Sequence, residues 1–181
     1  MKTTALVSTV TFEVGVLPRR SVADGQRLSP SDPAVLAITD FTREHPATVD
    51  PDRQIDDALN DMVRLGVRAL LVGKDQRIVG LITSYDIQGE RPMQFLQSST
   101  YQHHHEIRVG HIMTPWQALS ALNWETVQAM RAGDLLKLVE DSGLTHVVVM
   151  EADRAAHSCV VRALVSRARL MRQLSGTPRA H

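Results

Sequence analysis

Cysteine, aromatic residues, excess charge and long apolar runs are all scarce in this sequence. The single cysteine, Cys159, excludes an internal disulfide and fits a reducing compartment. Aromatic residues make up only 4% of the chain, too few to predict stacking platforms for single-stranded nucleic acid. Because 20 basic residues balance 20 acidic ones, no overall charge favours nucleic acid or a membrane surface.

No apolar run approaches the roughly 20 residues of a membrane span. The mildly apolar start is interrupted by Ser and Thr and ends at Glu13, which is a poor pattern for a signal peptide. We therefore expect a cytoplasmic protein with no membrane contact.

The motifs of several common enzyme classes are missing too. There is no Gly-x-Ser-x-Gly elbow, Walker loop, His-Glu-x-x-His or Cys-x-x-Cys. The run HHHE at 103–106 does not predict a metal site, because consecutive helical residues point about 100° apart. Cys159 lies in an apolar segment without an evident activating base. We expect neither an enzyme nor a metal, and no cofactor.

The main positive feature is an internal repeat. In the first copy, RQIDDALNDMVRLGVRALLV, one helical face carries Ile55, Ala58, Leu59, Met62 and Val63. Gly66 ends this helix, and an apolar strand is expected over 68–72. A turn, GKDQR, and a second apolar strand, IVGLI, follow and run into Thr83, which can cap another helix.

The second copy, AGDLLKLVEDSGLTHVVV, repeats this order. Its inward-facing residues are Leu135, Leu136 and Val139, Gly143 ends the helix, and a strand is expected over 145–150. A longer turn and the strand CVVRALV lead to Ser166, another hydroxyl that can cap a helix.

Each copy thus reads helix, strand, turn, strand, helix, and neither has enough sheet to be stable alone. We infer an α/β (α+β) fold in which the two copies pack sheet against sheet. The expected segments are an N-terminal extension with a strand over 8–17 (1–33), repeat 1 (34–90), a linker helix (91–108), a diverged repeat 2 (109–176) and a tail (177–181).

This arrangement resembles a tandem pair of CBS domains, the regulatory module named after cystathionine β-synthase. The likeness lies in VDPDRQIDDALNDMVRLGVRALLVGKDQRIVGLITSYDI at 49–87, VGHIMTP at 109–115 and VRALVSRARLMRQL at 161–174. It implies two β-α-β-β-α repeats forming one disc, which commonly dimerises. It also implies an adenosine ligand (AMP, ADP, ATP or S-adenosylmethionine) in the cleft between the repeats, with occupancy passed on through a homodimer or a separate effector protein.

The segment from Gly80 to Asp86, GLITSYD, matches the family's Gly-apolar-apolar-Thr/Ser-x-x-Asp grip. Two interpretations stay open and are compatible. Thr83 and Asp86 can cap a helix reciprocally, or the helix start can hold a phosphate while Asp86 accepts from both ribose hydroxyls. The resemblance implies that the nucleotide-binding residues are Thr83, Asp86, Gly80, Ser84, Ile82, Ala47, Thr48 and Arg68.

The second copy departs from this grip. Ala163 replaces the glycine, Ser166 keeps the hydroxyl, and Arg169 stands where the carboxylate belongs. Either Ser166, Arg167 and Arg169 form a second anion site, or Arg169 belongs to a vestigial copy and extends into solvent. In both cases we expect at most one orthodox site. Trp124, aligned with Ala47, either stacks on a base or fills an empty cleft.

Three functions follow as hypotheses. The first is an adenine-nucleotide sensor, and the second is a ligand-free scaffold or dimerisation module. The third, which the overall charge balance does not favour, is nucleic-acid binding through the C-terminal segment, where no acidic residue follows Asp153 and several arginines do.

Overall fold

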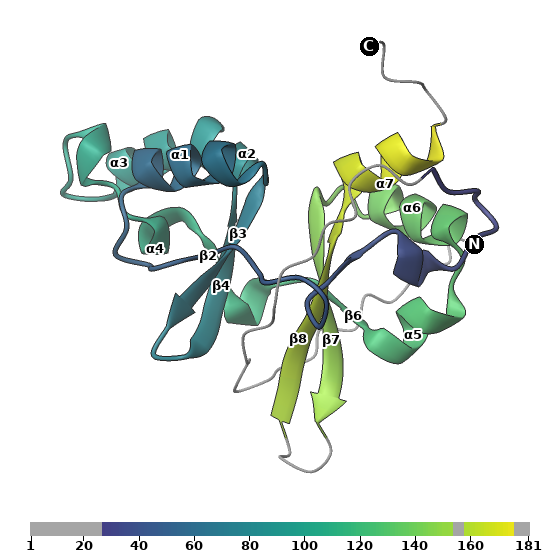
Figure 1. Ribbon diagram of the computed structural model, residues 1–181. Helices are drawn as coiled ribbons and strands as arrows, with labels where there is room; N and C mark the ends of the chain where they lie inside the picture. Colours follow the sequence, from purple (N-terminus) through teal and green to yellow (C-terminus); the bar gives the residue numbers. More distant parts are fainter. Residues whose placement is uncertain (1–26, 154–157, 176–181) are drawn as a thin grey trace, which may run out of the picture. The chain divides into compact units, whose positions relative to one another are not determined.

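The computed structural model describes residues 27–153 and 158–175, which form two compact units (Figure 1). Unit 2 spans Pro46–Leu119, and unit 1 combines Met1–His45 with Ser120–His181. The strand expected over 8–17 and the tail at 177–181 lie outside the described residues. Within the described part of the chain, no helix has both the length and the apolar character needed to cross a membrane.

Unit 2 contains a four-stranded sheet in the order β2-β3-β4-β5. β2 runs parallel to β3, whereas the β3–β4 and β4–β5 pairs are antiparallel. Its elements are β2 (Thr48–Val49), α1 (Ile55–Leu65), β3 (Ala69–Lys74), β4 (Arg77–Thr83), α2 (Ser84–Gln88), α3 (Arg91–Ser98), α4 (Val109–Ile112) and β5 (Thr114–Pro115), with 3₁₀ turns η2 (His104–Glu106) and η3 (Trp116–Ala118).

Unit 1 has a sheet of the same kind in the order β1-β8-β7-β6. β6 is parallel to β7, and the long β7–β8 hairpin is antiparallel (Figure 1). β1 pairs with β8 at the edge of the sheet. Its elements are η1 (Ala34–Leu36), β1 (Thr39–Asp40), β6 (Ala121–Asn123), α5 (Trp124–Ala129), α6 (Ala132–Asp141), β7 (His146–Asp153), β8 (Ser158–Ser166) and α7 (Arg167–Leu174). The two units together confirm the predicted mixed fold of duplicated helix–hairpin–helix segments.

The short strand ahead of each repeat pairs with the hairpin of the other repeat. β1, which precedes the first repeat's helix, lies against β8 in unit 1, and β5, which precedes the second, lies against β4 in unit 2. The two sheets are therefore completed by an exchange of lead-in strands. The sequence repeat alone does not reveal this exchange, because a two-residue strand carries too little pattern.

The helix α1 shows how the sequence builds the core of unit 2. Ile55, Ala58 and Met62 are spaced at helical intervals and are fully or almost fully buried. Gly66 ends the helix in the left-handed region at φ 68°, as predicted. Val63, expected on the same buried face, is 76% exposed, so that assignment was wrong. Its position is one residue beyond Met62 and therefore faces outward around the helix.

Candidate functional site

Thr83 and Asp86 bond to each other where β4 ends and α2 begins. The Oδ2 atom of Asp86 accepts from the Thr83 backbone N–H at 2.8 Å and from its Oγ1 hydroxyl at 2.7 Å. In return, the Asp86 backbone N–H donates to Thr83 Oγ1 at 3.2 Å. This reciprocal arrangement is a complete capping box, so the structural interpretation of the two residues is confirmed.

The second carboxylate oxygen of Asp86 faces an arginine from the next helix. Arg91 Nε lies 3.2 Å from Asp86 Oδ1, and the Asp86 side chain is only 14% exposed. Arg91 Nη1 also donates to the carbonyl of Ile112 at 2.8 Å and to Thr114 Oγ1 at 3.1 Å. Sequence reasoning missed Arg91, because no motif position marks it and its hydrogen-bond partners, Ile112 and Thr114, lie more than twenty residues further along the chain.

The start of α2 is a weak anion site by itself. The helix has only 5 residues, so few peptide dipoles align behind its first turn. Two of the donors there are used within the chain: the Ser84 N–H donates to the Arg68 carbonyl at 2.9 Å, and the Asp86 N–H donates to Thr83. Any phosphate held here needs side-chain donors as well.

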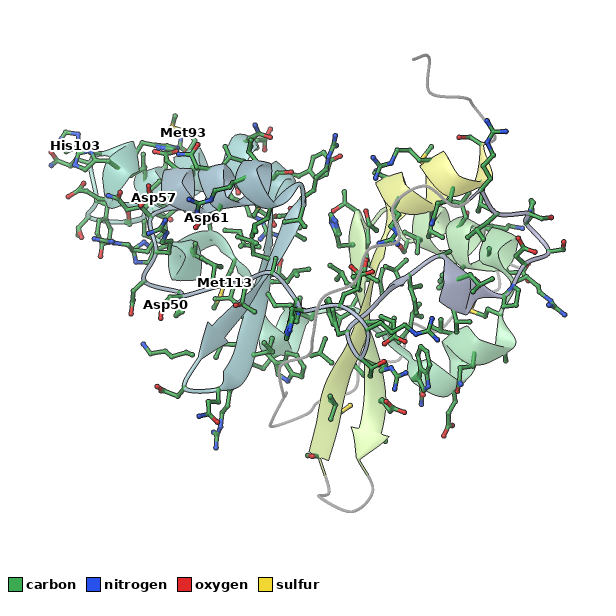
Figure 2. The ribbon with its side chains drawn as sticks, viewed as in Figure 1. Asp50, Asp57, Asp61, Met93, His103 and Met113 are labelled. Atoms are coloured by element: carbon green, nitrogen blue, oxygen red, sulfur yellow. The ribbon has the colours of Figure 1, made fainter. Side chains whose placement is uncertain are left out.

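Gly80 and Ile82 serve the packing of unit 2. A Cβ atom on Gly80 would lie 2.6 Å from the Thr114 carbonyl oxygen and 2.8 Å from Met113 Sδ (Met113 is labelled in Figure 2). The close approach that glycine permits at this position is therefore made by β5. Ile82 is fully buried in the unit 2 core, so it can offer a ligand only its backbone.

The other predicted residues flank the same end of the sheet. Arg68 is exposed and its Nη1 donates to the Tyr85 hydroxyl at 3.1 Å, beside Ser84 and the capping box. Ala47 and Thr48 lie at β2, where the Ala47 carbonyl accepts from the Leu71 N–H at 2.9 Å and Thr48 is exposed. All eight residues therefore belong to one unit.

The strand register confirms the predicted correspondence between Ser166 in unit 1 and Thr83 in unit 2. His146 pairs with Ser166 as Ala69 pairs with Thr83. Ser166 precedes α7, but its side chain makes no capping hydrogen bond, contrary to the prediction. The reciprocal partner is missing, because Arg169 replaces the carboxylate of Asp86.

Arg169 does not extend into solvent, so that interpretation was wrong. Its side chain is partly buried, and Nη1 donates to Thr39 Oγ1 at 2.8 Å in β1. Arg167, the remaining member of the suggested second anion site, follows Ser166 directly, and its N–H donates to the Thr145 carbonyl at 3.0 Å.

The alignment of Trp124 with Ala47 was also wrong. Ser120 takes the place of Ala47, because its carbonyl accepts from the Val148 N–H on the neighbouring strand. Trp124 instead opens α5, which lies between β6 and α6, and packs against the unit 1 core. The Arg162 guanidinium lies 4.3 Å from the centroid of its ring, so this face of the indole is covered by the chain itself.

Arg162 also forms an ion network in unit 1. It bonds to Asp40 through Nε at 3.1 Å and Nη2 at 3.3 Å, and to Glu151 through Nη1 at 2.8 Å. Partial burial raises the pKa of Asp40, but hydrogen bonds from Thr42 and the Arg162 guanidinium outweigh it and lower that pKa overall. The network holds β1 on the edge of β8.

The histidine run forms separate contacts and no common centre. His103 and His105 stack with ring centroids 5.4 Å apart, while His104 Nδ1 lies 3.3 Å from Asp56. Glu106 accepts from the N–H groups of Gln102 and His103. Within residues 27–153 and 158–175, no three potential metal-ligating side chains gather.

Unit 2 also has an open hollow of about 400 Å³ beside α3 and β5. Its walls include Arg91, Phe95, His111 and Met113, and the His111 ring stacks on Phe95 at 4.5 Å. Neither Thr83 nor Asp86 lines it, although Arg91 contacts both the hollow and Asp86.

Comparison with known proteins agrees with this architecture. Residues 38–91 match the model of the CBS domain family. No curated protein matches the chain. Residues 38–91 therefore resemble a CBS domain, and the chain has the fold of solved proteins that contain CBS domains.

Three solved structures illustrate the likeness. An uncharacterised conserved protein from Pyrococcus horikoshii is 19% identical, with 85% of this chain and 98% of that chain covered and a TM-score of 0.56. CBSX2 in complex with AMP is 21% identical, with 78% and 93% covered and a TM-score of 0.51. The CBS domain of the bacterial CNNM/CorC family Mg²⁺ transporter in complex with ATP is 14% identical, with 81% and 89% covered and a TM-score of 0.52.

Proposed function

We propose that this chain is a regulatory module that binds an adenine nucleotide at unit 2. The observation that carries the proposal is the Thr83–Asp86 pair at the end of β4, inside the segment that matches the CBS domain family. Two proteins with the same fold have structures in complex with AMP and with ATP, respectively. The proposal assigns the chain no catalytic step.

The side chains around this pair offer suitable chemistry for a nucleotide. Asp86 Oδ1 keeps an acceptor position beside Arg91, which suits a ribose hydroxyl. Arg68 is exposed and can exchange the Tyr85 hydroxyl for a phosphate oxygen, a stronger charge-assisted partner. The resemblance to the family supports the proposal that Thr48 and the Ala47 backbone at β2 contact the base.

Unit 1 supports the expectation of a single site per chain. Arg169 replaces the carboxylate and donates to Thr39, and the Trp124 ring is covered by Arg162. A diol therefore has no carboxylate acceptor at the corresponding place.

Calorimetry with AMP, ADP, ATP and S-adenosylmethionine tests the proposal. We expect at least one of them to bind below millimolar concentration, one per chain, and Asp86→Asn to weaken binding at least tenfold. Asp134→Asn is the matched control, because Asp134 is an exposed carboxylate in the first turn of α6. Absence of binding by all four ligands, or equal binding by Asp86→Asn, contradicts the proposal.

The competing function is a scaffold without a ligand. The complete capping box and the ion pair with Arg91 explain Thr83 and Asp86 structurally. If Asp86→Asn lowers only the free energy of unfolding, the scaffold function is correct.

We propose that the chain dimerises through the outer surface of α1, α2 and α3. Val63, Tyr85 and Met93 are 76%, 48% and 60% exposed on these neighbouring helices, and Met93 is labelled in Figure 2. Light scattering is expected to give the mass of two chains, and Val63→Asp is expected to give the mass of one. A monomeric wild type contradicts this part of the proposal.

Nucleic-acid binding through α7 is the remaining alternative. Arg169 is held by Thr39, which leaves Arg167 and Arg172 as further basic groups of the helix. DNA or RNA affinity that falls steeply with salt would favour this alternative, and a flat response removes it.

A further inference from the structure

A phosphate at the start of α2 needs side-chain donors, and two such donors lie beside the capping box. Arg68 Nη1 donates to the Tyr85 hydroxyl at 3.1 Å. Arg68 directly precedes β3, and its carbonyl accepts from the Ser84 N–H at 2.9 Å, which fixes its backbone next to the first residue of α2. Tyr85 directly precedes Asp86 in the same helical turn. The guanidinium–phenol pair and the Thr83–Asp86 pair therefore share one end of the sheet in unit 2.

Both side chains of this pair keep donors that the chain does not use. A guanidinium has five N–H donors, and the bond to Tyr85 uses one of those on Arg68. The Tyr85 hydroxyl is the acceptor in this bond, so its own proton is left to donate. Among residues 27–153 and 158–175, neither side chain has a second hydrogen-bond or ion-pair partner. Arg68 is exposed and Tyr85 is 48% exposed, so a ligand can reach both.

A guanidinium and a phenol that can both donate suit a phosphate group. Phosphate oxygens form charge-assisted hydrogen bonds, which are stronger than the bond between Arg68 and a neutral hydroxyl. A phosphate oxygen placed between the two side chains accepts from Arg68 Nη1 in place of the Tyr85 oxygen. The Tyr85 hydroxyl then donates its own proton to the same phosphate, so that neither side chain loses a partner.

The direction of the Tyr85 side chain agrees with the layout of a nucleotide. Tyr85 and Asp86 are consecutive in a helix, so their side chains point about 100° apart. A nucleotide likewise carries its diol and its 5′-phosphate on different carbon atoms of the ribose, several bonds apart. One ligand can therefore place its diol at Asp86 and its phosphate at the Arg68–Tyr85 pair.

Unit 1 lacks both donors at the corresponding positions. Thr145 takes the place of Arg68, because each carbonyl accepts an N–H from the first residue of the following helix, at 3.0 and 2.9 Å. Ala168 takes the place of Tyr85, because each is the second residue of that helix. Of the two units, unit 2 alone therefore has the guanidinium–phenol pair, and it is also the unit that has the carboxylate Asp86.

We propose that Tyr85 is a phosphate-binding residue of the proposed nucleotide site. Its hydroxyl and the Arg68 guanidinium bind the same phosphate, and this pair selects a phosphorylated adenosine over adenosine itself. The inference rests on the proposed function. It adds a binding residue that the sequence motif does not mark, and it defines the class of ligand as a phosphate ester.

Paired calorimetric titrations test the role of Tyr85. One ligand is adenosine, and the other is whichever of AMP, ADP and ATP binds wild type most tightly. Tyr85→Phe removes the hydroxyl and keeps the ring. We expect this variant to bind the nucleotide about three- to tenfold more weakly, as for the loss of one hydrogen bond, and to bind adenosine as wild type does. Tyr101→Phe is the matched control, because Tyr101 is another exposed tyrosine of unit 2.

An Arg68→Met background separates direct donation by Tyr85 from positioning of Arg68. If the Tyr85 hydroxyl donates to the phosphate, Tyr85→Phe weakens nucleotide binding relative to adenosine in this background as well. If Tyr85 only holds Arg68 in place, Tyr85→Phe has no further effect once Arg68 is replaced. Absence of a further loss therefore overturns the role of Tyr85 as a phosphate ligand.

The remaining outcomes distinguish this inference from the proposed function. Equal weakening of nucleotide and adenosine by Tyr85→Phe shows a structural role, and an unchanged nucleotide affinity shows no role. Each overturns the inference while nucleotide binding stands. The inference is also overturned if wild type binds adenosine as tightly as the nucleotides, or binds only S-adenosylmethionine, which has no phosphate. If wild type binds none of these ligands, the proposed function fails, and this inference with it.

Discussion

Replacing Gly80 by alanine tests the packing that supports the site. The added Cβ would lie 2.6 Å from the Thr114 carbonyl oxygen and 2.8 Å from Met113 Sδ. The methionine side chain can move, but the carbonyl belongs to the backbone of β5. To relieve the contact, β5 must move away from β4, where only two residue pairs join them.

Overpacking of this kind typically costs about 1–3 kcal/mol of stability. Gly73→Ala is the matched control in the same hairpin, because its Cβ would meet only the Arg77 carbonyl oxygen, at an ordinary 3.7 Å. Glycine-to-alanine changes at such compatible positions are neutral or stabilise by about 0.4–1 kcal/mol.

Urea denaturation followed by circular dichroism compares the two variants. We expect Gly80→Ala to unfold at lower urea concentration than wild type, and Gly73→Ala at the same or a higher concentration. Equal midpoints for the two variants would refute the reasoning, because they would show that β5 does not press against Gly80.

Three further outcomes are expected. Thr83→Val removes the hydroxyl that caps α2 and should lower the free energy of unfolding by about 1 kcal/mol in urea denaturation; no loss would contradict the cap. The pKa of Asp40 is lowered from its ordinary 3.8, so its contribution to stability is present above pH 3.8 and is lost as the pH falls through the folded-state pKa. Thermal unfolding from pH 5 to 2 should therefore show that wild type loses stability more steeply with falling pH than Arg162→Met does. Equal slopes of melting temperature against pH would show that the Asp40–Arg162 pair does not contribute. Burial raises the pKa of Cys159 to about 11, so iodoacetamide should alkylate it slowly at pH 8 unless urea is added, whereas rapid native labelling would contradict its burial.

The fold was largely predictable because long, strongly patterned segments specify it. Ile55, Ala58 and Met62 carry a clear helical period, and Gly66 marks the end of α1 through its left-handed backbone. The hairpin register followed from the same repeat, which correctly placed Ser166 in the position of Thr83. The exchange of β1 and β5 could not be predicted, since a two-residue strand has no period of its own.

The candidate site was predictable only in part. The capping box followed from the spacing of Thr83 and Asp86, because reciprocal bonds require that spacing. Arg91 was not found, because its bonds depend on where β5 packs. The error at Trp124 arose from an assumed constant spacing, whereas α5 lengthens the connection between β6 and α6.

An NMR titration with AMP tests nucleotide binding at unit 2 most directly. The account predicts saturable shifts of the backbone amide signals of Thr83, Ser84 and Asp86 below millimolar AMP, with the amides of Ser166 and Arg169 unmoved. Signals that do not move, or that saturate around Arg169 instead, contradict it.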